Sequence, residues 1–93
     1  MEFRLVLDSS FKLGDDIVYR IVDGEAFVLD VGRGEHFSLN RIATEILKFL
    51  DEGKSCREIL NYQTREYGKD REALHSDLAF FIAELTRKGI VVN

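Results

Sequence analysis

The residue types that most often carry chemistry are few in this chain and lie far apart. Its two histidines, His36 and His75, and its single cysteine, Cys56, show none of the short spacings, such as HExxH or CxxC, that hold a metal ion. His36 is expected to face Asp30 across a sheet, and His75 to lie on a helix surface. The sequence therefore predicts no metal site, no cofactor and no catalytic centre, and the chain is not expected to be an enzyme.

Cys56 allows two interpretations. It falls in the first turn of an expected helix, where the helix dipole lowers the pKa of a thiol and favours reactivity. A free cysteine is more often a small buried apolar side chain, and we favour that role. A single cysteine also excludes an internal disulfide, which fits a reducing compartment such as the cytoplasm.

The composition predicts one domain of modest size. The chain has 93 residues, of which 45% are hydrophobic. With 13 basic and 17 acidic residues its net charge is −4, which argues against a general attraction to nucleic-acid phosphates. There is no apolar run of about 18 residues and no signal-peptide pattern, so neither a membrane segment nor export is expected.

The segment IVYRIVDGEAFVLDV predicts a β-hairpin. Two runs of β-branched and aromatic residues flank Asp23-Gly24, a dipeptide that suits a two-residue type I′ turn. A second turn, GRG at 32–34, leads to a third strand, EHFSL at 35–39.

The register between the second and third strands follows from the length of that second turn. A three-residue loop pairs large apolar side chains, with Leu29 opposite Phe37 and Phe27 opposite Leu39. Asp30 then lies opposite His36, on the other face.

This sheet is expected to be apolar on both faces, and helices can cover only one of them. The face expected against the helices carries Val18, Val22, Phe27, Leu29, Phe37 and Leu39; the opposite face carries Ile17, Tyr19, Ile21, Ala26 and Val28. The opposite face needs a cover of its own. The candidates are the N-terminal arm, whose Phe3, Leu5 and Leu7 have strand spacing, a partner chain, or a ligand.

After the strands the apolar period changes to that of a helix, which predicts three helices. Their ends are marked by Asn40 and Gly53, by Ser55 with Glu58 and Gly68, and by Asp70 and Gly89. The third helix has a core stripe of Leu74, Leu78, Phe81, Ile82 and Leu85. This order predicts an α+β, winged-helix-turn-helix-like fold, with a three-stranded antiparallel sheet followed by three helices. Residues 1–13 are expected to form an extended arm and residues 14–93 the domain itself.

Winged-helix nucleic-acid-binding or regulatory domains share this plan, and they provide the alternative function. The third helix offers Asp77, Phe80 and Glu84 where helices that read a DNA groove carry Arg, Lys, Asn or Gln. Nucleic acid is therefore not expected as a partner. A structural homodimer is a third class, because a second copy would cover the second apolar face.

Two adjacent aromatic residues of the third helix suggest different roles. Phe81 belongs to the core stripe, whereas Phe80 lies about 100° away around the helix. Phe80 either packs under the arm or a loop, or lines an open apolar groove beside the strand at 35–39. A groove bordered by free backbone groups suits an added peptide strand.

Three segments of the chain resemble one known family. DGEAFVLDVGRGEHFSLN, then AxxIxxFLDEGK, then DLAFFIAELTRKGIV are similar in order and spacing to the PqqD-like family of small peptide chaperones. These proteins are also known as the recognition elements of pathways that make ribosomally made, post-translationally modified peptides. The resemblance covers about residues 14–92.

The resemblance implies a non-catalytic domain that binds the leader segment of a precursor peptide. The leader adds as a strand to the third strand, packs against the third helix, and is presented to a peptide-modifying enzyme such as a radical SAM maturase or a leader peptidase. Carried onto this chain, the site is Glu35, His36, Phe37, Ser38, Leu39, Leu74, Asp77, Leu78 and Phe81, to which the helical wheel adds Phe80.

The chain departs from the family pattern at two positions. Arg41 stands where relatives often have proline, and Leu47 where they often have tryptophan. Arg41 either gives the end of the groove a positive charge for an acidic leader, or is a solvated residue of the first helical turn.

Overall fold

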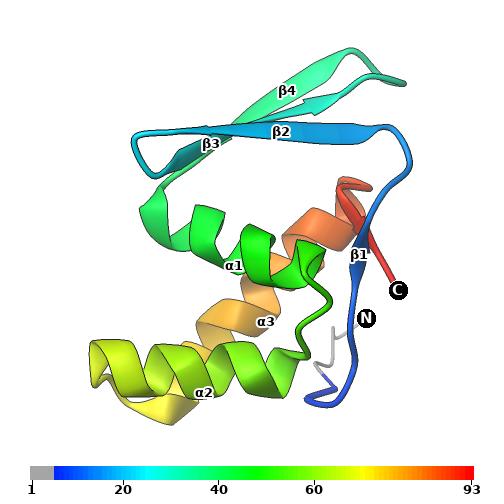
Figure 1. The fold of residues 1–93 in the computed structure, drawn as a ribbon. Helices are drawn as coiled ribbons and strands as arrows, with labels where there is room; N and C mark the ends of the chain where they lie inside the picture. The colour runs from blue at the N-terminus through cyan, green and yellow to red at the C-terminus, as the bar shows by residue number, and fades with distance from the viewer. Residues whose placement is uncertain (1–5) are drawn as a thin grey trace.

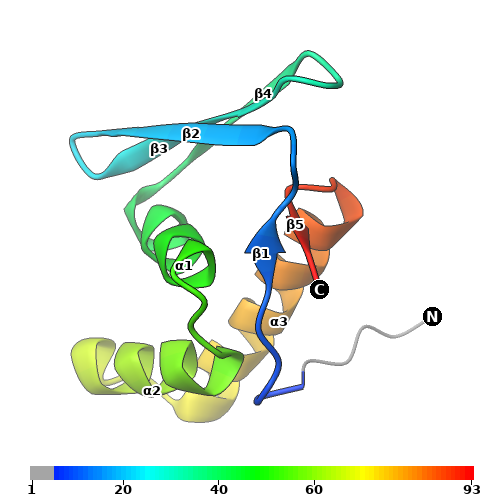
Figure 2. The ribbon, with the colours of Figure 1, turned by 45° about the vertical axis from the view of Figure 1, so that its right-hand side comes forward.

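The computed structural model describes residues 6–93 and shows an α+β domain. The elements are β1 (Lys12–Leu13), β2 (Ile17–Val22), β3 (Glu25–Asp30), β4 (Glu35–Leu39), α1 (Arg41–Asp51), α2 (Cys56–Tyr67), α3 (Arg71–Arg87) and β5 (Val91–Val92). Strands β2, β3 and β4 form an antiparallel sheet in that order, and β1 pairs with β5 in a second, two-stranded sheet. Figures 1 and 2 show α1 and the C-terminal end of α3 against one face of the larger sheet, with α2 farther from it. The predicted order of three antiparallel strands followed by three helices is confirmed.

The β2–β3 turn has the predicted geometry. Val22 pairs with Glu25, so two residues form the turn, and both have positive φ (55° at Asp23 and 80° at Gly24), as a type I′ turn requires. The first residue of α1 also holds this turn, because Arg41 Nη2 donates to the carbonyl oxygen of Asp23 at 3.2 Å. The positive φ favours glycine at position 24, and a Cβ there would displace the Arg41 side chain, whose Nη1 would lie 2.6 Å away.

The predicted register of β3 and β4 is wrong by one residue. Val28, not Leu29, lies opposite Phe37, and Leu29 lies opposite His36. Asp30 pairs with Glu35.

The reason is that the loop has four residues, 31–34, rather than three. The carbonyl oxygen of Asp30 accepts a bond from Gly34 N at 2.8 Å, and its carboxylate accepts one from Arg33 N at 3.1 Å. These bonds stabilise the longer loop, in which Gly34 takes a φ of 69°.

The corrected register also reverses the expected roles of the two faces. The face against the helices carries Ala26 and Val28, which are 0% and 1% exposed. The bare face carries the large apolar side chains Val18, Val22, Phe27 and Leu29, which are 42–55% exposed. The face that was expected to need the arm is therefore the core face.

The described part of the N-terminal segment lies along α2 and not on the sheet. The carbonyl oxygens of Leu7 and Ser9 accept bonds from Arg57 N and Cys56 N, at 2.7 and 3.1 Å. Phe3 and Leu5 lie outside the described residues. Beyond this contact the chain enters β1, which pairs with β5, and Phe11 is buried in the core.

The predicted cap residues of the three helices are confirmed. Asn40 Oδ1 accepts from Ala43 N at 2.8 Å, Ser55 and Glu58 form a reciprocal capping box, and Asp70 caps α3. The buried stripe of α3 consists of Leu74, Leu78, Ile82 and Leu85, while Phe81 is half-buried.

One buried hydroxyl joins the sheet to α1. Thr44 is 3% exposed, and its Oγ1 accepts from Ala26 N at 2.8 Å and donates to Leu39 O at 3.3 Å. The same side chain thus contacts the central strand and the end of β4, which sets the distance between the sheet and the helix.

Thr44→Val is expected to lower the free energy of unfolding by about 1–3 kcal/mol, because it leaves the buried N–H of Ala26 without this partner. Thr44→Ser keeps the hydroxyl and is expected to cost under ~1 kcal/mol, the value of one buried methyl group. Urea unfolding of the two variants measures both. Equal losses would contradict a structural role for the hydroxyl.

Candidate functional site

Strand β4 has one free edge. It is the last strand in the order β2-β3-β4, and within residues 6–93 it pairs only with β3. Glu35, His36 and Ser38 are exposed, whereas Phe37 and Leu39 are half-buried toward the helices. The backbone groups along the free edge can therefore pair with an added strand, whose side chains would alternate between the two faces of the sheet.

The C-terminal end of α3 lies beneath the middle of β4. The ammonium group of Lys88 sits 4.8 Å from the centroid of the Phe37 ring, close enough for a cation–π contact. Phe37 and the partly buried Phe81 both pack against the core. The side of β4 that faces α3 is thus mostly apolar, with the ammonium group of Lys88 against its central residue, Phe37.

A cavity of about 260 Å³ adjoins the C-terminal end of β4, between α1 and α3. Its lining consists of Asn40, Ile42, Ala43, Ile46, Gln63, Tyr67, Lys69, Leu74, Asp77, Leu78 and Phe81. We call this cavity the α1–α3 groove. It contains four of the residues predicted on the third helix, Leu74, Asp77, Leu78 and Phe81.

Phe80, the fifth predicted residue of that helix, is not part of the groove lining and is 71% exposed. No described residue buries it, so it is not packed under the part of the arm that the structure describes. It presents an aromatic surface on the outer side of α3.

Tyr67 forms a fixed wall of the groove through Glu45. Tyr67 Oη donates to Glu45 Oε1 at 2.6 Å, and Tyr62 Oη donates to Glu45 Oε2 at 3.0 Å. The bond to Glu45, with partial burial, raises the pKa of Tyr67 to about 12, and the same carboxylate raises the pKa of Tyr62. Both phenols are therefore neutral donors at physiological pH.

Sequence reasoning missed the contribution of α2 to the groove. Gln63 and Tyr67 are one helical turn apart, so they point the same way. The signal that could have indicated this contribution was Gln63, a polar residue at a helical spacing of three from Leu60, which is buried.

Arg41 is exposed in the first turn of α1, which agrees with the second of the two roles expected for it. Its guanidinium donates to the carbonyl oxygen of Asp23 in the β2–β3 turn, and Arg41 is not among the residues that line the groove. The charged residues at the groove are Lys69 and Asp77, both exposed.

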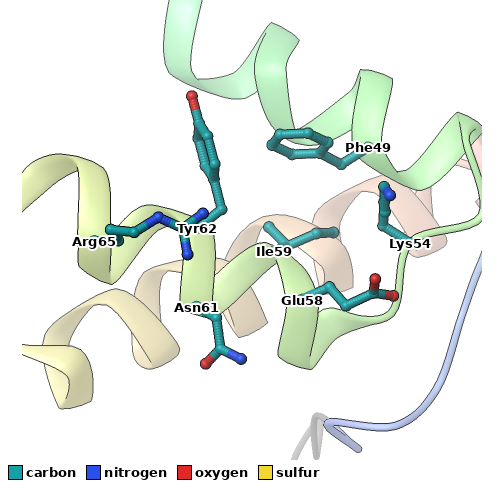
Figure 3. A pocket seen from close by; sticks show the side chains of 7 residues that line it. All are labelled: Phe49, Lys54, Glu58, Ile59, Asn61, Tyr62 and Arg65. Atoms are coloured by element: carbon teal, nitrogen blue, oxygen red, sulfur yellow. The ribbon is translucent and has the colours of Figure 1, made fainter.

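A second hollow, of about 350 Å³, lies between the end of α1 and α2 (Figure 3). Phe49 and Tyr62 meet edge to face there, with ring centroids 4.9 Å apart, and Lys54 and Arg65 stand at its rim. None of the predicted site residues lines it. It is more polar than the α1–α3 groove, and it has no strand edge beside it, so it serves as a control surface.

Other kinds of site can be addressed only over residues 6–93. No group of three or more His, Cys, Asp or Glu side chains in that part could hold a metal ion. Cys56 is 0% exposed and burial raises the pKa of its thiol, which confirms the buried apolar role over the reactive one. No helix in this range is long and apolar enough to cross a membrane.

The fold and the site together define a small α+β domain with an open strand edge beside an apolar groove. Residues 25–91 match the family model described as Coenzyme PQQ synthesis protein D (PqqD), and the chain belongs to this family. No curated protein matches the chain.

Two solved structures share the fold over nearly the whole chain. One, described as TbiB1 in complex with the TbiA(beta) leader peptide, is 31% identical, with a TM-score of 0.83, covering 86% of this chain and 93% of that one. The other, described as lasso peptide synthetase B1 complexed with the leader peptide, is 27% identical, with a TM-score of 0.84, covering 91% of this chain and all (100%) of that one.

The tyrosine–carboxylate bonds predict an alkaline titration. The pKa values of Tyr67 and Tyr19 are raised to about 12, and that of Tyr62 is also raised, above the ordinary value of 10.0. A pKa raised on folding means that the contribution of these groups to stability is complete below pH 10 and is lost toward pH 12. Absorbance at 295 nm is expected to show all three tyrosines ionising above pH 10.

Glu45→Gln provides the matched test. The variant is expected to lower the midpoints of Tyr62 and Tyr67 and to leave Tyr19 unchanged, because burial and Asp51 raise the pKa of Tyr19. A titration of Tyr67 that is the same with and without the carboxylate would contradict the assigned bond.

Proposed function

We propose that this chain is a non-catalytic protein that binds the leader segment of a ribosomally made precursor peptide and presents it to a maturation enzyme. The observation that carries the proposal is the free edge of β4 beside an apolar groove. It is supported by TM-scores of 0.83 and 0.84 to two proteins whose structures contain leader peptides.

The leader would lie antiparallel to β4 and exchange backbone bonds with Glu35–Leu39. Backbone pairing supplies affinity that depends little on sequence, while the pockets for alternate side chains supply specificity. Inward side chains of the leader would meet Phe37 and Phe81, and those near the end of β4 would enter the α1–α3 groove.

The outward side chains of the leader would extend the bare face of the sheet. That face exposes Val18, Phe27 and Leu29, an apolar surface of the kind that binds another protein. We assign it to the modifying enzyme, such as a radical SAM maturase or a leader peptidase, with a homodimer as the competing arrangement. In this proposal residues 14–93 form the peptide-binding domain, residues 1–13 its arm, and the protein acts in the cytoplasm.

A synthetic peptide of the leader is expected to shift the amide resonances of residues 35–39 and 74–81 in a titration followed by NMR. The reason is that strand addition changes the hydrogen bonding of β4, while the side chains of the leader contact α3. The residues around Lys54 and Arg65, in the second hollow, serve as the control and are expected not to move. Shifts confined to α2 or to the β2–β3 hairpin would contradict the assigned site.

Phe81→Ala is expected to weaken leader binding about thirtyfold or more, since loss of a desolvated aromatic anchor costs at least ~2 kcal/mol. It is also expected to lower stability, because Phe81 packs against the core. Phe80→Ala is expected to change leader affinity little and stability by under ~0.5 kcal/mol, because this side chain is 71% exposed and does not line the groove. Asp77→Ala is expected to weaken leader binding less than Phe81→Ala does.

Phe27→Ala is the control for these variants. Phe27 is an aromatic residue on the bare face, 55% exposed, and it is expected to leave leader affinity unchanged. Isothermal titration gives the affinities, and urea unfolding gives the stabilities. Equal weakening by Phe27→Ala and Phe81→Ala would contradict the proposed groove.

A further inference from the structure

The second hollow, between the end of α1 and α2, has an apolar lining that is held in a fixed shape. This lining consists of the rings of Phe49 and Tyr62 and the buried side chain of Ile59. The two rings meet edge to face with centroids 4.9 Å apart, and Tyr62 Oη donates to Glu45 Oε2 at 3.0 Å. These contacts orient the rings before anything binds, which lowers the entropy cost of binding.

Two cations flank this apolar lining. Figure 3 shows Lys54 and Arg65 on opposite sides of the hollow, with the apolar side chains between them. The backbone holds the first cation beside the rings, because Lys54 N donates to Phe49 O at 3.0 Å. The second lies near a ring face, with Arg65 Cζ 6.0 Å from the centroid of Tyr62. Both side chains are exposed, so their charges are accessible to a bound molecule.

Neither cation has an anionic partner in the described part of the chain. Arg33, Arg57 and Arg87 form ion pairs with carboxylates. Over residues 6–93, no ion pair includes the ammonium group of Lys54 or the guanidinium group of Arg65. The whole chain has a net charge of −4, so two unpaired cations beside an apolar hollow are a local exception to an acidic protein.

The other polar groups of the lining already have partners. Glu58 Oε1 accepts from Ser55 N at 2.9 Å in the capping box of α2, and Asn61 Oδ1 accepts from Arg71 Nη1 at 2.9 Å. The capping bonds lower the pKa of Glu58, so this side chain is a carboxylate at neutral pH. The lining therefore carries two positive charges against one negative charge, and its unused chemistry is an apolar surface with a cation on either side.

We propose that the second hollow is a docking site for an acidic segment of a partner protein, in which an apolar side chain lies between two carboxylates. The apolar side chain would contact the two rings, and the carboxylates would pair with Lys54 and Arg65. The inference goes beyond leader binding, because the hollow shares no lining residue with the α1–α3 groove and the two sites can be occupied together. Complementary charges at the rim of an interface favour the right partner and speed association more than they add affinity.

Three short peptides, acetylated and amidated so that only side chains carry charge, test the inference on the whole chain. They are Glu-Phe-Glu, Gln-Phe-Gln and Glu-Ala-Glu. In ~0.15 M salt, Glu-Phe-Glu is expected to bind about fivefold more tightly than Gln-Phe-Gln, which corresponds to about 1 kcal/mol for two exposed ion pairs. This preference is expected to shrink in ~1 M salt, because ions screen exposed charges. Glu-Phe-Glu is also expected to bind more tightly than Glu-Ala-Glu, because its ring contacts the aromatic lining. Affinities come from NMR titration, followed at the backbone amides of residues 54–65.

The double variant Lys54→Gln with Arg65→Gln removes both cations at exposed positions, so the fold is expected to persist. We expect it to bind Glu-Phe-Glu and Gln-Phe-Gln equally. Lys12→Gln with Lys48→Gln is the matched control, because it changes the net charge by the same amount at exposed residues outside the lining. The control is expected to keep the preference for Glu-Phe-Glu.

Four results would overturn the inference. Two concern charge: equal binding of Glu-Phe-Glu and Gln-Phe-Gln to the natural chain, and a preference that persists in the double variant. The third is equal binding of Glu-Ala-Glu and Glu-Phe-Glu, which would indicate a site for any anion. The fourth is a shift of the same amides when the protein is concentrated without peptide, which would make a second copy of the chain the occupant. Because none of the peptides is a leader, each result leaves the proposed function to its own test.

Discussion

Strand β4 runs directly into helix α1 without a loop. The positions of the sheet and the helices relative to one another depend on this junction. Leu39 is the last residue of the strand, Asn40 is the cap, and Arg41 begins the helix. Bonds on both sides of this junction fix its angle: Asn40 holds the first turn of the helix, and Thr44 holds the central strand. A strand joined to a helix in this way cannot pivot independently of it, so the free edge of β4 keeps a set position above α3.

Because this junction is rigid, the open edge of β4 can pair with an added strand in a defined position. An exposed strand edge ordinarily promotes unwanted pairing between molecules. Here the strand is only five residues long, and the helical layer beneath it decides which side chains an added strand can place inward.

The features that local chemistry decides were predictable from the sequence. The cap residues Asn40, Ser55 and Asp70 and the Asp23-Gly24 turn act within a few residues of their own position, and all were identified correctly. The register of β4 was not predicted correctly. Strand β3 is apolar on both faces, so its alternating pattern does not show which face points toward the helices. The register depends on the bonds of Asp30 within its loop and on Thr44, which no hydrophobic pattern reveals.

The same reasoning explains which parts of the candidate site were found. Family resemblance indicated β4 and α3, where Leu74, Leu78 and Phe81 line the groove. The residues from α2 were missed because, in the pattern of an amphipathic helix, Gln63 resembles an ordinary surface residue and Tyr67 resembles a core residue. Only the packing of α2 against α3 makes them part of the groove.

The small sheet of β1 and β5 also bears on the order of events in folding. It joins Leu13 to Val91, so its two residue pairs close a loop that contains every other helix and strand described in the domain. Contacts between residues so distant in sequence cost the most loop entropy and tend to form late. The hairpin and the capped helices can assemble first, and β1 and β5 then pair once the core has formed. The stability of the β1–β5 pairing is therefore expected to affect mainly the rate of unfolding of the domain, and to affect its rate of folding little.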